Sequence, residues 1–257
     1  MSNSLRSLTS GSSSSGSGVS HSHANLAILD GIKIDNYGRI YYDAGSVSNS
    51  DIVSSSSLCL FGSLSDISGY GNHPSSTQGS SPSLSLGLDN QPALYFSGLA
   101  NQELGINPFL ANATGCTLYA VVSADSSAGN YGLVDTYSNE SWWNYNNQGY
   151  FGVFLNSRLE NYPSPMPASG TGYHLISIHA RVADYEVWVD KVSKGVRSLS
   201  TSQFNVGTHF VISRADRPFK GYLSLLCVVP RWLDPNGSEH QTKLGGIKSR
   251  FPSLPFV

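Results

Sequence analysis

Residues 173–190, YHLISIHARVADYEVWVD, contain two short runs in which every second residue is apolar. This alternation predicts two β-strands, each with one face toward a core. The residues expected on that face are Ile176, Ile178, Ala180 and Val182 in the first run and Tyr185, Val187 and Val189 in the second. Asp184, between the two runs, is expected to lie at a turn, so the stretch is predicted to be an antiparallel hairpin.

Short β-rich runs of this kind recur from about Leu58 onward, separated by Gly, Pro, Asn and Asp. The eight runs are PALYFSG, TLYAVVSAD, YGLVDTY, GYFGVFLN, YHLISIHARV, YEVWVDK, HFVISR and GYLSLLCVVP. Many short strands at this spacing predict an all-β protein, a two-sheet antiparallel sandwich. The one helical candidate, residues 235–248, is interrupted by Gly245-Gly246.

The first 57 residues differ in composition from the rest. Four segments are expected: an extended Ser/Gly-rich arm at 1–19, an attachment segment at 20–45, a Ser-rich linker at 46–57 and the sandwich at 58–257. The arm carries too little apolar surface to build a core of its own.

Composition excludes several classes of function. Charged residues make up 12% of the chain and the formal net charge is −2, so no basic field indicates a nucleic-acid partner. No apolar run reaches the length of a membrane-spanning helix, and no apolar secretory signal opens the chain. The three cysteines, Cys59, Cys116 and Cys227, are expected to be buried thiols in a protein assembled in a reducing cytoplasm.

Residues 61–98 resemble the opening of a laminin-G-like, concanavalin A-like jelly roll. The matching residues are Asp66, Ser68, Gly69, Gly71, Asn72 and His73, followed by Ala93, Leu94, Phe96 and Gly98. Later segments resemble the family's strands in the same order, over roughly residues 58–252. The resemblance implies a lectin-like jelly-roll sandwich. The residues of the Asp66 motif are typical of a structural turn. The alternative is a calcium site formed by Asp66 and Asn72.

A second resemblance covers HSHANLAILDGIKIDNYGRIYYDAG, residues 21–45. This segment is similar to one found in tail fibre and baseplate proteins of bacteriophages. The matching residues are His21, His23, Asn25, Leu29, Asp30, Gly38, Ile40 and Tyr42. The resemblance implies a homotrimer in the virion tail, assembled in the host cytoplasm. The residues expected to attach and trimerise the chains are Asn25, Leu26, Ile28, Leu29 and Ile32.

His21 and His23 are two residues apart, so in an extended chain both side chains point to one side. In a trimer, three such pairs would offer six imidazoles, an octahedral shell for iron or another transition-metal ion shared by the three chains. The alternative is that both are ordinary polar residues at the end of the leader.

No catalytic site is predicted. A glycanase of this fold would need a pair of carboxylates on one strand, and Asp184, Glu186 and Asp190 do not have that spacing. Neither a Gly-x-Ser-x-Gly elbow nor a His-Glu-x-x-His motif is present.

Residues 135–150, DTYSNESWWNYNNQGY, are expected to form an exposed aromatic loop that binds glycan. The candidate glycan-binding residues are Tyr137, Asn139, Trp142, Trp143, Tyr145, Asn147 and Tyr150. Aromatic faces and planar amides suit a sugar ring and its hydroxyls. Burial of this loop between trimer subunits is the alternative.

Together the resemblances imply a non-enzymatic phage tail fibre or receptor-binding protein. Its N-terminal segment would dock on other tail or baseplate proteins, and its lectin-like domain would recognise a host cell-surface polysaccharide. The alternative is a structural baseplate or fibre adaptor whose sandwich contacts other virion proteins. Neither nucleic-acid binding nor membrane insertion is expected.

Overall fold

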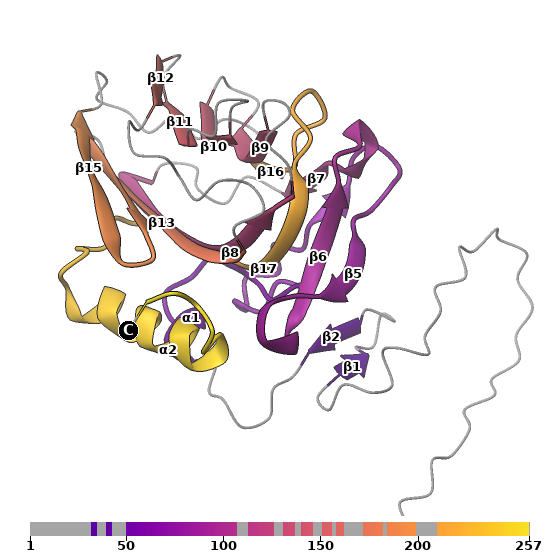
Figure 1. Cartoon of the computed structure of the whole chain (residues 1–257), viewed down its shortest axis with the longest axis horizontal. Coiled ribbons are helices and arrows are strands. Elements are labelled where there is room, and N and C mark those ends of the chain that lie inside the picture. The colour runs from indigo at the N-terminus through magenta and orange to yellow at the C-terminus, as the bar shows by residue number, and fades with distance from the viewer. Residues whose placement is uncertain are drawn as a thin grey trace, which may run out of the picture. The chain divides into compact units, whose positions relative to one another are not determined.

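The computed structural model describes residues 32–34, 40–42, 50–106, 113–125, 131–136, 140–145, 151–155, 158–161, 172–181, 184–198 and 210–256. Two antiparallel sheets face each other, and helix α2 (Ser238–Arg250) lies on the outer side of one of them (Figure 1). The expected all-β jelly-roll sandwich is therefore confirmed.

The first sheet has eight strands in the order β15 (Val192–Ser198), β14 (Asp184–Val189), β13 (His174–Arg181), β8 (Gly115–Ala124), β17 (Lys220–Val229), β6 (Pro92–Ser97) and β5 (Ser83–Leu86), with β3 (Leu58–Leu60) paired to β17. The second has seven strands in the order β12 (Arg158–Asn161), β11 (Phe151–Leu155), β10 (Glu140–Tyr145), β9 (Tyr131–Thr136), β16 (Phe210–Ile212), β7 (Leu104–Ile106) and β4 (Ser75–Ser76). A separate hairpin pairs β1 (Ile32–Ile34) with β2 (Ile40–Tyr42).

All eight predicted strands are present, and the predicted hairpin is β13–β14, with Ile178 opposite Val187. The inward residues of this hairpin join the core between the sheets. Main members of that core are Leu94, Phe96, Leu118, Ala120, Val134, Ile176, Ile178, Tyr185, Val187, Phe210, Leu223 and Leu226.

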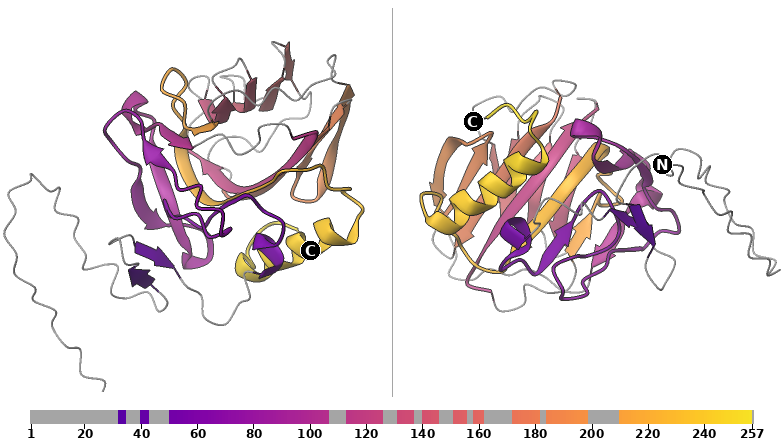
Figure 2. Two further views of the ribbon diagram at one scale, coloured as in Figure 1. Left: turned by 180° about the vertical axis from the view of Figure 1, so that it is seen from behind. Right: turned by 90° about the horizontal axis from the view of Figure 1, so that it is seen from below.

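A second core lies on the outer face of the eight-stranded sheet, under α2. Its main members are Ile52, Cys59, Tyr119, Val121, Leu225, Cys227, Val229, Leu244, Ile247 and Phe251. The helix α2 crosses only part of this face, and β5 and β6 lie beyond it (Figure 2). Gly245 and Gly246 do not interrupt α2, contrary to the expectation from their low helix propensity, because the helix is held by packing on the sheet.

Part of the stretch expected to be a linker is ordered against α2. Ser50–Val53 form the short helix α1, and the buried side chain of Lys243 donates from Nζ to the carbonyl of Ile52 at 2.7 Å and to that of Ser54. Lys243 thus satisfies carbonyls at the end of α1 that no further helical turn can satisfy. Burial lowers the pKa of Lys243 to about 8.

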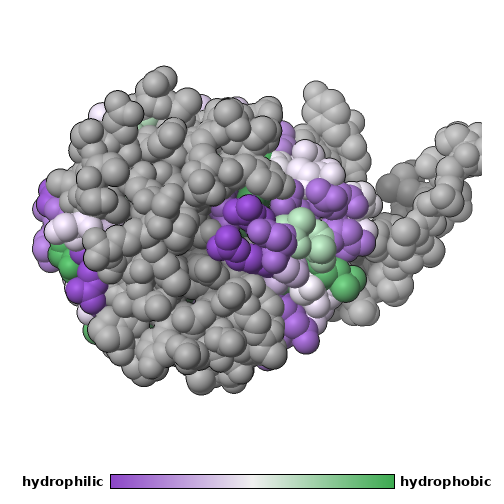
Figure 3. Space-filling model, turned by 90° about the horizontal axis from the view of Figure 1, so that it is seen from above, coloured by the Kyte–Doolittle hydropathy of each residue, from purple (hydrophilic) through white to green (hydrophobic). Residues whose placement is uncertain are grey.

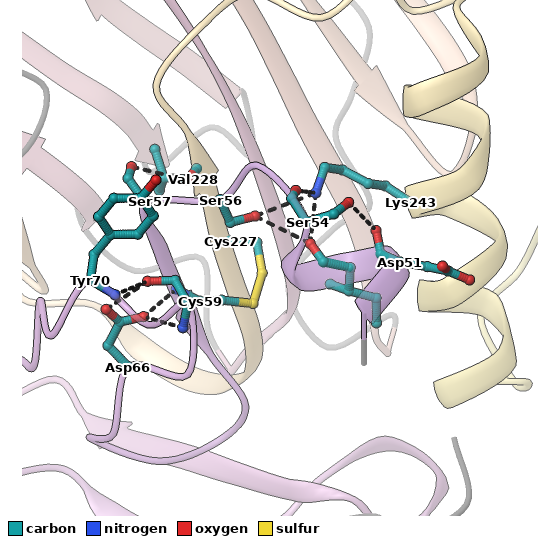
Figure 4. The surroundings of a disulfide bond; sticks show 12 residues. Asp51, Ser54, Ser56, Ser57, Cys59, Asp66, Tyr70, Cys227, Val228 and Lys243 are labelled. Atoms are coloured by element: carbon teal, nitrogen blue, oxygen red, sulfur yellow. Dashed lines mark hydrogen bonds between the residues drawn. A yellow bond between two sulfur atoms is a disulfide. The ribbon is translucent and has the colours of Figure 1, made fainter. Parts of the chain in front are cut away.

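The cysteine prediction was wrong in part. Cys59 and Cys227 are direct partners across β3 and β17 and form a disulfide, whereas Cys116 is a buried thiol. Burial raises the pKa of the Cys116 thiol well above its ordinary value. Figure 4 shows the disulfide between the Asp66 turn and Lys243. The pairing depends on the register of two strands that are distant in sequence, so spacing alone could not reveal it.

The coloured atoms on this side of the molecule are mainly hydrophilic, with a small hydrophobic area among them (Figure 3). No helix among the described residues is long and apolar enough to span a membrane.

Candidate functional site

Two tyrosines lie side by side on the outer face of the eight-stranded sheet. Tyr95 in β6 and Tyr222 in β17 are direct cross-strand partners. Their neighbours Leu94 and Leu223 belong to the core between the sheets. Because side chains alternate along a strand, both tyrosines point to the opposite, outer side.

A third tyrosine extends this pair. The ring centroids of Tyr95 and Tyr222 are 4.8 Å apart with the planes tilted by 41°, and those of Tyr222 and Tyr173 are 6.2 Å apart with a tilt of 50°. All three side chains are half-buried, so each retains area in contact with solvent. We call Tyr95, Tyr173, Tyr222 and the neighbouring Asp125 the tyrosine patch.

Asp125 supplies a carboxylate at the Tyr95 end of the patch. Its backbone N–H donates to the carbonyl of Lys220 at 3.1 Å, which ties the residue after β8 to the start of β17. The pKa of Tyr95 is raised by burial, and further by its hydrogen bond to the Asp125 carboxylate and by that negative charge. The hydrogen bond from Tyr95 therefore orients the exposed carboxylate of Asp125 at the edge of the patch.

Tyr173 lies just before β13 and packs partly against the core under α2. Burial raises the pKa of Tyr173 to about 12, although the nearby hydroxyl of Ser224 lowers it. Gly87, in the connection between β5 and β6, makes room for this pair. A Cβ at Gly87 would collide with the hydroxyl oxygen of Ser224 and lie 2.8 Å from that of Tyr173.

The chemistry of the patch suits a sugar. The face of an aromatic ring carries partial negative charge and can contact the C–H groups of a sugar ring. A carboxylate accepts hydrogen bonds from sugar hydroxyls, and a tyrosine hydroxyl can donate or accept them. Aromatic surface with a few placed polar groups is the usual composition of a small-molecule site.

The aromatic stretch predicted as a loop is in part a strand. Trp142, Trp143 and Tyr145 lie in β10, which pairs with β9 and β11, so the loop prediction was wrong for these three residues. Trp143 is the partner of Val134, and the register shifts on either side of it. At the start of the stretch, the fully buried Asp135 forms an ion pair with Arg214 at 3.3 Å, which holds β9 against the loop after β16.

The other predicted glycan-binding residues, Tyr137, Asn139, Asn147 and Tyr150, lie outside the described residues. So do His21 and His23 and the attachment residues Asn25, Leu26, Ile28 and Leu29. Ile32 begins β1 and is the partner of Tyr42. The glycan, metal and attachment assignments for these residues remain predictions.

Asp66 holds a turn together with its whole carboxylate. Oδ1 accepts from the backbone N–H groups of Cys59 and Ser68, and Oδ2 accepts from the Ser68 hydroxyl and the N–H of Asn72, at 2.8 to 2.9 Å. The Asn72 amide donates to the carbonyl of Ser57 at 2.6 Å. These contacts give Asp66 a structural role. Among the described residues, no three His, Cys, Asp or Glu side chains are grouped so as to hold a metal ion.

Sequence reasoning missed the tyrosine patch although it predicted the strands that carry it. The signal lay in PALYFS, where Tyr95 is the large residue between the inward Leu94 and Phe96. A single outward tyrosine is unremarkable, because many surface residues are apolar. The patch exists only because three distant segments bring their tyrosines together.

No family model matches the sequence, and no curated protein matches it. Solved structures do match. Domain 4 of a GH43 extracellular arabinanase from Geobacillus stearothermophilus, solved with arabinotriose, has a TM-score of 0.55 and 14% identity over 70% of this chain and 91% of that one.

Two botulinum neurotoxin structures also match. The type C neurotoxin, whose cell entry depends on two ganglioside molecules, has a TM-score of 0.56 and 10% identity over 77% of this chain and 53% of that one. The receptor-binding domain of the C/D mosaic has a TM-score of 0.57 and 11% identity over 75% and 51%. This chain spans about half the length of those two. At these identities the likeness establishes a shared sandwich fold.

Proposed function

We propose that the sandwich is a non-enzymatic, lectin-like recognition domain and that the tyrosine patch contacts the sugar. The observation that carries this proposal is the contact of three half-buried tyrosine rings beside an exposed carboxylate, on the outer face of the eight-stranded sheet. The arabinotriose and the gangliosides named for structures of the same fold support it by analogy.

We further propose that this domain is the host-recognition part of a homotrimeric phage tail fibre. The support is the resemblance of residues 20–45 to phage attachment segments. That segment would dock on other tail or baseplate proteins, with His21 and His23 holding a shared transition-metal ion. Three linked domains would raise the apparent affinity of a weak sugar site without new contacts.

The test is binding of the purified full chain to soluble polysaccharides by affinity electrophoresis. The panel includes arabinan, xylan, dextran and surface polysaccharides of candidate bacterial hosts. We expect at least one polymer to retard the protein, and the double variant Tyr95→Ala/Tyr222→Ala to migrate as if no polymer were present.

Tyr70→Ala is the matched control, because Tyr70 is 72% exposed and belongs to the Asp66 turn. It should bind like the unmodified chain. A parallel variant, Trp142→Ala/Trp143→Ala, tests the site predicted from the β10 sequence. If the tryptophan changes abolish binding and the tyrosine changes do not affect it, the sugar-binding site lies in β10 and the tyrosine patch is not the site. Retardation by no polymer would refute glycan recognition and favour the structural adaptor.

A further inference from the structure

We propose that the tyrosine patch binds a single soluble polysaccharide chain that lies across the strands and contacts the patch with several sugar rings. This inference rests on the proposed function and specifies its ligand. The two alternatives are a terminal sugar held alone and the flat surface of an insoluble polysaccharide.

The direction of the ligand follows from the strand register. Tyr222 has Tyr95 as its partner on one side and Ser123 of β8 on the other. The small side chain of Ser123 leaves room above β8, and Tyr173, which precedes β13, brings its ring to 6.2 Å from that of Tyr222. The rings of Tyr95 and Tyr222 therefore follow one another across the strands, and the ring of Tyr173 lies next to that of Tyr222. We call this series of three rings the row.

The length of this row exceeds one sugar ring. Its ring centroids are 4.8 Å apart from Tyr95 to Tyr222 and 6.2 Å apart from Tyr222 to Tyr173, so together the rings extend beyond the width of a single sugar. A terminal sugar held by one ring would leave the other two rings unused. A chain laid along the row would contact all three.

The tilts between the rings distinguish a chain from a flat surface. Neighbouring rings are inclined by 41° and 50°, so no single plane can lie against all three. The chains of an ordered insoluble polysaccharide present their sugar faces in one plane. A free chain can rotate at each glycosidic bond, so its successive sugars can match successive tyrosines. Because the tyrosine rings already pack against one another, only the polysaccharide chain loses conformational freedom on binding.

A carboxylate lies at the Tyr95 end of the row, where Asp125 is hydrogen-bonded to Tyr95. The hydroxyl of Tyr173 instead lies beside the buried Ser224 of β17 and close to Gly87. Asp125 is therefore the group placed to accept hydrogen bonds from the hydroxyls of a bound sugar.

The experiment uses the polysaccharide that retards the full chain most strongly. Its partial hydrolysis gives a size series from the monosaccharide to the hexasaccharide, and each is titrated into the protein by calorimetry. We expect affinity to rise about tenfold or more from the monosaccharide to the trisaccharide, since each stacked ring adds interaction energy, and then to level off.

Variants locate the chain on the row. Tyr222→Phe keeps the ring and should bind the trisaccharide within about threefold of the unmodified chain, whereas Tyr222→Ala should lose about tenfold or more. Tyr173→Ala should weaken the trisaccharide and leave the monosaccharide unchanged. Thermal unfolding of each variant separates loss of the site from loss of the fold.

Two results would overturn the inference while leaving glycan recognition intact. One is a monosaccharide that binds as tightly as the trisaccharide. The other is a polysaccharide that binds as an insoluble particle and fails to bind in solution. Absence of binding to any polymer would instead refute the proposed function, and this inference with it.

Discussion

Acidification from about pH 7.5 to pH 5.0 should destabilise the packing of α2 on the eight-stranded sheet through two buried histidines. His179 in β13 and His240 in α2 are 0% and 1% exposed, and their ring centroids are 4.7 Å apart. The hydroxyl of Tyr119 lies 2.8 Å from Nδ1 of His240. Nδ1 of His179 donates to the carbonyl of Leu233 at 2.9 Å, so its Nε2 is free to accept from Ser177 when the ring is neutral.

Both pKa values are lowered in the folded protein. Burial lowers the pKa of His179 from 6.5 to about 3, and the neighbouring His240 contributes in the same direction. Burial lowers the pKa of His240 to about 4, and the charge of Lys191 adds to this effect. Asp234 opposes both shifts without cancelling them.

The sign and size of the effect follow from linkage. The unfolded chain binds a proton at each histidine below about pH 6.5, and the folded chain does not until the pH approaches the lowered pKa. Stability is therefore complete above pH 6.5 and is lost as the pH falls from there toward 4. Between pH 7.5 and 5.0 each histidine costs about 2 kcal/mol, so the pair costs about 3 to 4 kcal/mol when the less enclosed His240 is discounted.

Urea unfolding of the full chain at the two pH values, followed by tryptophan fluorescence, measures this difference. His240→Gln should lower stability at pH 7.5 and remove about 1 to 2 kcal/mol of the pH-dependent loss. Gln241→Ala, at an exposed position of the same helix, keeps both histidines and should shift stability equally at both values. A His240→Gln chain with the full pH-dependent loss would refute the reasoning.

Two further predictions concern glycine and the Asp66 turn. Gly246→Ala should destabilise the chain by about 1 to 3 kcal/mol, because its Cβ would lie 2.9 Å from Cγ1 of Ile52. Its matched control, Gly245→Ala, has no atom within 4 Å of the new Cβ and should stabilise α2 by up to about 1 kcal/mol. Asp66→Ala removes four hydrogen bonds and should cost about 2 to 4 kcal/mol. Urea midpoints measure all three, and a Gly246→Ala chain as stable as Gly245→Ala would contradict the packing of α1 on α2.

Much of the sandwich could be predicted from local pattern. The strongest strands alternate strictly, as in β13, where Ile176 and Ile178 enter the core while Ser177 and His179 face α2. Alternation was enough there because the apolar side chains are enclosed between the sheets, whereas Ser177 and His179 on the other face are hydrogen-bonded to each other. The short strands such as β4 and β7 have too few residues to show a period, and only pairing with their neighbours defines them.

The outer face of the eight-stranded sheet required tertiary information. Along β17 the outward side chains are apolar where α2 covers them, as at Leu225 and Val229, and amphipathic where it does not, as at Tyr222. Where α2 begins and which face it covers cannot be read from the strand itself. The helix is fixed instead by contacts with distant α1, including the close approach at Gly246 and the hydrogen bonds of Lys243.

The candidate site also depends on one irregularity within β17. The register with β8 shifts between Leu223 and Leu225, so Ser224 is an extra residue in the strand. Regular alternation backward from the outward Leu225 would place Leu223 on the outer face and turn Tyr222 into the core. The shift reverses this, and Tyr222 joins Tyr95 on the outside. One inserted residue thus decides whether the strand contributes a tyrosine to the core or to the surface, and only the paired sheet reveals which.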